Sequence, residues 1–101
     1  MKSVMYNPTD ARADGMAGWG IRFTPDTSMV LVTVSGQYDG SLQLVYGKGA
    51  PMVRVGSAFT GSGTFSKTVS FAVDPGVEYT LDLVLQGEAF NVDVVIMSLP
   101  Y

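Results

Sequence analysis

The chain has 101 residues, which suits one domain with a single hydrophobic core. Its net charge is -3 and its Lys and Arg residues are scattered, so it lacks the basic stripe that nucleic-acid binding requires. The absence of Cys excludes disulfides, thiolate metal sites and cysteine nucleophiles, and apolar runs of four residues or fewer are too short to span a membrane.

The first part of the chain carries little periodic pattern. Residues 7–18 contain one plausible helical turn, which Gly15 and Gly18 cut short. We therefore interpret residues 1–18 as a loop-rich N-terminal lead-in. Residues 19–24 then alternate between apolar and other side chains, and this alternation predicts the first strand.

Two strands joined by a tight turn are predicted next. Residues 29–35 place three valines on one face, and residues 41–46 place two leucines and a tyrosine on one face. Between them, Asp39-Gly40 is a strong hairpin signal, because the mirror-image turns that join two strands require positive φ. We expect a hairpin at this dipeptide.

Residues 47–66 are less regular. Their glycines and Pro51 leave room for one short strand, Met52–Val55. We interpret this region as the long connection of the fold, and residues 47–63 as a candidate binding loop, since binding residues concentrate on loops.

The last third of the chain predicts a meander of three strands, over residues 67–73, 77–85 and 89–99. Asp74-Pro75-Gly76 predicts a tight turn, since proline presets φ at its position and glycine supplies positive φ at the next. Gln86-Gly87-Glu88 predicts a second turn. Together with the earlier segments this gives roughly seven strands, which is typical of an all-β, antiparallel β-sandwich or jelly-roll-like fold in a single domain over residues 1–101.

The order of these elements carries a resemblance. The glycine-rich lead-in is followed by Phe23-Thr24-Pro25, by VLVTVSG over residues 30–36, by QLVYGKGAP over residues 43–51, and by PGVEYTLDL over residues 75–83. This order resembles small β-sandwich modules of bacteriophage tail-fibre and virion-appendage proteins. The sequence departs from that pattern in a short turn at residues 37–40, and in Arg54 and Phe59, where small residues are usual.

The resemblance implies a virion structural subunit in a homo-oligomer, and it implies no catalysis. Its expected partners are further copies of itself, with a trimer favoured, and other virion proteins. We expect neither nucleic acid nor membrane insertion among its interactions.

Acidic residues supply the candidates for chemistry. Asp82 and Asp93 lie on successive predicted strands, where paired carboxylates could hydrolyse glycosides, but alternation alone explains them as solvent-facing residues. Asp10, Asp14 and Asp39 lie in predicted loops, yet their spacing matches no calcium loop and turn formation explains them better. We therefore predict no catalytic residues, no metal site and no cofactor.

Besides self-association, the sequence offers a candidate ligand or docking loop. Its candidate residues are Tyr38, Lys48, Arg54 and Phe59. Exposed aromatic rings can stack on sugar faces, so host surface glycans are an alternative partner and a carbohydrate-binding module is the alternative function. Trp19 alternates with apolar neighbours and is expected in the core.

The apolar content favours an interface between subunits. Hydrophobic residues make up 47% of the chain and charged residues 15%, against a usual charged share of about 25%. A small domain leaves part of such content exposed. The last predicted strand is apolar on both faces from Val94 to Met97, and we expect Val95 and Met97 to face a partner.

Overall fold

The computed structural model describes residues 2–11, 15–48 and 53–99. These residues form a six-stranded antiparallel sheet. The strands are β1 (Lys2–Ala11), β2 (Gly15–Met16), β3 (Ile21–Phe23), β4 (Met29–Gly47), β5 (Val53–Ala72) and β6 (Tyr79–Ser98). The predicted all-β, antiparallel fold class is confirmed. Among the described residues, no helix is long and apolar enough to cross a membrane.

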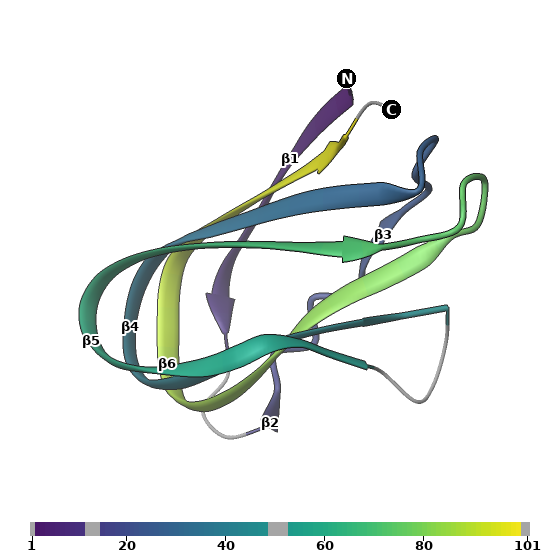
Figure 1. Cartoon of the computed structure of the whole chain (residues 1–101). Helices are drawn as coiled ribbons and strands as arrows, with labels where there is room; N and C mark the ends of the chain where they lie inside the picture. The colour runs from purple at the N-terminus through teal and green to yellow at the C-terminus, as the bar shows by residue number, and fades with distance from the viewer. Residues whose placement is uncertain (1, 12–14, 49–52, 100–101) are drawn as a thin grey trace.

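The sheet makes a sandwich by bending over on itself. Its order is β1-β6-β4-β5, with β2 and β3 also pairing with β6. Figure 1 shows β4, β5 and β6 curving together so that their two halves face each other. We call the half containing residues 29–35 of β4 the first layer, the half containing residues 41–47 the second layer, and residues 36–40 with their neighbours on β5 and β6 the bend.

The two hairpin turns predicted at Asp39-Gly40 and at residues 86–88 are wrong. β4 and β6 each continue as one bent strand through these positions, and Gly40 pairs directly with Gly87. Both glycines have positive φ, +136° and +108°, and a Cβ on either would collide with the backbone of the facing strand. At these positions glycine allows the strands to bend and to approach closely. A tight turn also needs glycine for its positive φ, so the dipeptide alone does not distinguish the two structures.

The irregular connection predicted over residues 47–66 is also wrong where the structure describes it. Residues 53–66 belong to β5, which pairs with β4 from Met29 to Tyr46. One irregularity interrupts this pairing, because three residues of β5 lie opposite Gln43 alone. Met52, which we placed in a short strand, lies outside the described residues.

The lead-in is a strand over much of its length, so its interpretation as a loop is wrong there. β1 pairs with the second half of β6, and the two residues of β2 pair with the first half. Pro8 interrupts the alternation of apolar and polar residues by which β1 could be predicted. The pairing of β1 with β6 has register shifts between Tyr6 and Ala11. Because β1 is an edge strand, a residue without an N–H is tolerated there.

The turn at Asp74-Pro75-Gly76 is confirmed. Gly76 has a φ of +79°, and the N–H of Val77 donates to the carbonyl of Asp74 at 3.3 Å. The N–H of Gly76 donates to the carbonyl of Pro25 at 2.8 Å, which ties this turn to the segment between β3 and β4.

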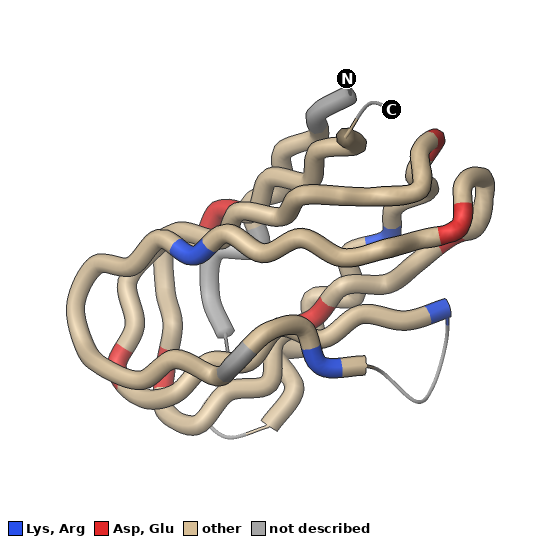
Figure 2. The backbone as a smooth tube through the Cα atoms, in the orientation of Figure 1, with Lys and Arg blue, Asp and Glu red and all other residues tan. Residues whose placement is uncertain are grey.

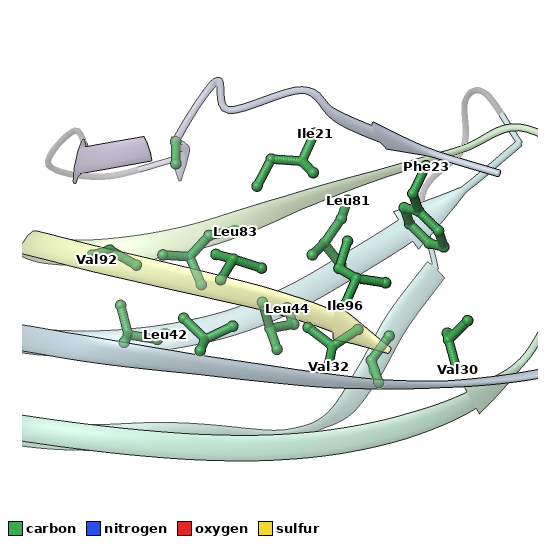
Figure 3. Close-up of a cluster of buried hydrophobic side chains, with 14 of the residues drawn as sticks. Ile21, Phe23, Val30, Val32, Leu42, Leu44, Leu81, Leu83, Val92 and Ile96 are labelled. Atoms are coloured by element: carbon green, nitrogen blue, oxygen red, sulfur yellow. The ribbon is translucent and has the colours of Figure 1, made fainter. Parts of the chain in front are cut away.

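The core lies between the two layers. Figure 3 shows apolar side chains of both layers pointing toward one another. The members that are fully excluded from water include Val30 and Val32 from the first layer and Leu42, Leu81 and Leu83 from the second. Each such side chain contributes about 1.5–3 kcal/mol through its burial. The rings of Tyr46 and Phe71 meet across the layers with their centroids 4.0 Å apart.

Candidate functional sites

The structure separates the four residues predicted to form one ligand or docking loop. Tyr38 and Phe59 meet at the bend, Lys48 follows the end of β4, and Arg54 lies on the outer face of the second layer opposite Val45. They do not form one site. Each location therefore has to be judged by its own contacts.

Tyr38 and Phe59 belong to a cluster with Phe65 on the inner side of the bend. The ring centroids are 5.7 Å apart for Tyr38 and Phe59, 5.0 Å for Tyr38 and Phe65, and 5.6 Å for Phe59 and Phe65. The rings are tilted against one another, and the Lys67 ammonium lies 5.6 Å from the Phe59 centroid. In this arrangement Tyr38 and Phe59 pack partly buried against the core, and Phe65 is buried in it.

Lys48 forms an ion pair with Asp74. Its Nζ donates to Asp74 Oδ2 at 3.0 Å, and both side chains are well exposed. This hydrogen bond, together with the attraction between the charges, lowers the pKa of Asp74 and raises the pKa of Lys48 from their ordinary values. The backbone N–H of Asp74 also donates to the Tyr79 hydroxyl at 2.8 Å. Lys48 thus links the 74–76 turn to the end of β4 through an exposed ion pair.

Arg54 lies beside the irregular pairing of β4 and β5. At this point Gln43 is only 9% exposed, and its Nε2 donates to the carbonyls of Val55 at 2.9 Å, Gly56 at 3.1 Å and Leu44 at 3.3 Å. Two of these bonds reach carbonyls of β5 at the irregularity, and the third reaches a carbonyl of β4. Beside it the surface is hollowed into a pocket of about 200 Å³. We call this the bulge pocket.

The bulge pocket draws its lining from three strands. The residues that bound it include Ser41 and Gln43 of β4, Arg54 and Ala58 of β5, and Val84 and Gln86 of β6. Of these, the sequence analysis identified only Arg54. Ser41 and Gln43 gave no signal of their own, because an outward polar residue on a strand is the ordinary pattern, and Gln86 was assigned to a predicted turn.

Val95 and Met97 lie on the outer face of the first layer, and that they face a partner stays a prediction. Their neighbours in β6 on the other face, Val92, Val94 and Ile96, are at most 5% exposed and fill the core. Val95 and Met97 are half-buried. Val95 lies between Thr33 and Met5, and Met97 lies between Leu31 and Ser3.

Met5 and Leu31 extend this apolar surface onto the strands beside β6. Met5 of β1 is 68% exposed, and Leu31 of β4 is half-buried. We call Met5, Leu31, Val95 and Met97 the outer apolar strip.

Asp82 and Asp93 do not form a catalytic pair. Asp82 pairs with Val45 in the second layer, and Asp93 pairs with Ser35 in the first. Asp82 is also not solvent-facing as predicted, since it is only 6% exposed. Its Oδ1 accepts hydrogen bonds from the N–H of Trp19 at 3.3 Å and of Leu83 at 2.7 Å, so it holds the 17–20 segment over the sheet.

Trp19 packs partly buried against the core, in agreement with its predicted place. Its Nε1 is buried without a hydrogen-bond partner among the described residues.

The predicted loop position of Asp39 is wrong, because it lies in β4 directly opposite Glu88 of β6. Figure 2 shows acidic residues on these neighbouring strands at the bend, and basic residues scattered elsewhere. The described residues contain no group of three or more potential metal-ligating side chains. Asp14 lies outside them, and the side chain of Asp10 is not described.

A groove of about 230 Å³ lies where the two layers part, between β1 and the segment around β3. Val4, which is 44% exposed, lines it together with Arg22, Pro25 and Glu78. The Tyr6 hydroxyl crosses the groove and donates to the carbonyl of Arg22 at 3.0 Å. That bond fixes β1 relative to β3.

Comparison with known proteins adds distant structural similarities. No protein-family model matches the chain, and no curated protein matches it in sequence. The globular domain of a zebrafish complement 1qA protein is similar with a TM-score of 0.40 and 16% identity, over 93% of this chain and 90% of that one. A family 16 carbohydrate-binding module is similar with a TM-score of 0.38 and 16% identity, over 90% of this chain and 72% of that one. At this distance the similarities say nothing about ligand or partner, and the fold class rests on the strand pairing itself.

Proposed function

We propose that this protein is a structural subunit of a bacteriophage virion, in a tail fibre, a tail or a capsid decoration, and that it acts by self-association and docking. The observation that carries this proposal is the outer apolar strip. It joins side chains of β1, β4 and β6 on a face that the chain's own core does not use. The assignment to a virion is supported by the resemblance of the strand order to tail-fibre modules.

Burial of the strip between copies is the proposed mechanism. Met5 is 68% exposed in the single chain, so a second copy seated on the strip removes apolar surface from water. Such an interface works without catalytic residues or cofactors. The proposed assembly is a homo-oligomer, with a trimer favoured, whose other surfaces contact further virion proteins.

Val95→Asp tests the proposal. We expect the wild-type chain to show the mass of an oligomer by light scattering coupled to sizing, and the variant to show the mass of a single chain. An unpaired charge buried at an interface costs several kcal/mol. Circular dichroism of the variant should remain that of a folded β protein, because Val95 faces away from the core.

The matched control is Thr64→Asp, which places the same charge on an exposed position of β5 opposite Gln37. We expect this variant to assemble like the wild type. A wild-type chain that is monomeric at micromolar concentration would overturn the proposal, and so would assembly that survives Val95→Asp unchanged.

A further inference from the structure

We infer that the bulge pocket binds an acidic sugar, a pyranose unit bearing a carboxylate. This inference goes beyond the proposed structural role and uses a different face of the molecule. The outer apolar strip lies on the first layer, whereas the bulge pocket lies on the second.

First, the shape of the pocket is fixed by hydrogen bonds of Gln43 and by the backbone conformation of Gly56. Gln43 takes up the irregularity of β5 with three hydrogen bonds from a single amide nitrogen, and Gly56 has the positive φ of +67° that the irregularity requires. The Gln43 Nε2 is therefore committed to backbone carbonyls, and the Gln43 side chain is fixed where it lines the pocket. A pocket wall fixed in this way favours binding of a defined ligand.

The second argument is the charge of the lining. Arg54 is exposed, and it makes neither a hydrogen bond nor an ion pair with any described residue. Among the described residues that line the pocket none is acidic, and Arg54 is the one that carries a formal charge. Arginine presents a planar set of donors that matches a carboxylate with two parallel hydrogen bonds, and such charge-assisted bonds are stronger than neutral ones.

The third argument concerns the rest of the ligand. Around Arg54 the pocket offers the Ser41 hydroxyl and the Gln86 amide as donors and acceptors, and it offers Ala58 and Val84 as apolar surface. A pyranose ring has hydroxyl groups around its rim and C–H groups on its faces. A bare carboxylate would use Arg54 and leave the remaining groups without a partner. The combination therefore favours a sugar acid over a simple organic anion.

The test is a titration of the isotope-labelled protein, followed by backbone NMR shifts, with sodium glucuronate, glucose, acetate and inorganic phosphate as separate probes. We expect saturable shifts with glucuronate that centre on Arg54, Ala58 and Gln86. We expect glucose and acetate, each of which lacks one half of the recognised chemistry, to bind at least about tenfold more weakly, and tenfold corresponds to about 1.4 kcal/mol.

Arg54→Gln should weaken glucuronate binding at least about tenfold. The matched control is Arg22→Gln, which removes the same exposed charge from β3, outside the bulge pocket, and should leave the affinity unchanged. Four results would overturn the inference: no saturable shifts with glucuronate, equal binding of acetate, equal binding of phosphate, or an affinity that does not depend on Arg54.

The outcome can be separated from that of the proposed function. Val95→Asp should retain glucuronate binding whether or not it assembles, because Val95 and Arg54 belong to different layers. Loss of oligomers with retained binding would therefore report on the outer apolar strip, and loss of binding with retained oligomers would report on the bulge pocket.

Discussion

Gly40→Ala should destabilise the protein severely, because the bend depends on two facing glycines. Gly40 has a φ of +136°, and a Cβ there would run into the carbonyl of Gln86 and lie 2.9 Å from the Cα of Gly87. A non-glycine residue in such a backbone conformation costs about 1–3 kcal/mol. Forcing extra volume against packed backbone costs about 1–3 kcal/mol more.

These two costs suggest a loss of about 3 kcal/mol or more in the free energy of unfolding. A domain of this size has about 5–15 kcal/mol of stability in total, so the variant should fold with a melting temperature lowered by about 12–24 °C. Thermal and urea unfolding followed by circular dichroism measure both quantities. The steric part acts through backbone atoms, which cannot rotate away as a side chain can.

Gly63→Ala separates the two contributions. Gly63 has a φ of +103°, but a Cβ there would meet nothing within 4 Å, so this variant carries the conformational cost without the collision. We expect it to lose about 1–2 kcal/mol. Equal losses in Gly40→Ala and Gly63→Ala would refute the close approach of β4 and β6 at the bend.

Two further predictions concern acidic residues. Asp82→Ala should reduce stability in urea unfolding by about 1–3 kcal/mol, because the N–H groups of Trp19 and Leu83 lose their acceptor, whereas Asp93→Ala should cost less than half as much. Lys48→Gln should raise the pKa of Asp74, measured by NMR titration, toward its ordinary value, because the hydrogen bond and the charge of Lys48 are the main causes of the lowered pKa. The lowered pKa of Asp74 stabilises the native state at a pH above the pKa of about 3.9 in the unfolded chain. This stabilisation is lost as the pH falls through the lower pKa of the native state. The variant lacks it and should therefore lose less stability on acidification than the wild type.

The strand segments over residues 29–35, 41–46, 67–72 and 79–85 could be predicted from the sequence because each has its own alternation. Val30, Val32 and Val34 share a face in the pattern, and they share the core in the structure. The turn at residues 74–76 could be predicted because proline and glycine fix its backbone locally.

The bend could not be predicted by such local reasoning. The dipeptide Asp39-Gly40 predicts positive φ at Gly40. Whether the chain turns back there or continues as a strand depends on Gly61 and Gly87, which face Gly40 from β5 and β6. β1 could not be predicted for a related reason, since its position is set by pairing with β6 instead of by an alternation in its own sequence.

The same distinction applies to the candidate sites. Val95 and Met97 could be placed on the outer face because they follow the alternation of β6. The bulge pocket joins Arg54 to Ser41 and Gln86, which come from three strands and meet only after the sheet has formed. Tyr38 and Phe59 could be named only as separate ligand candidates, because their contacts with each other and with Phe65 depend on the bend.

The pairing of β6 determines the order in which this chain can acquire its structure. In the part of the chain that the structure describes, β1, β2, β3 and β4 all pair with β6, the last strand, whereas β5 pairs with β4. Until residues 79–98 are available, the bent β4–β5 ribbon is the one part of the sheet that can form, and a two-stranded ribbon is marginal in water. The earlier strands therefore need the final one for their pairing, and because most contacts join distant parts of the chain we expect folding to be slow and cooperative.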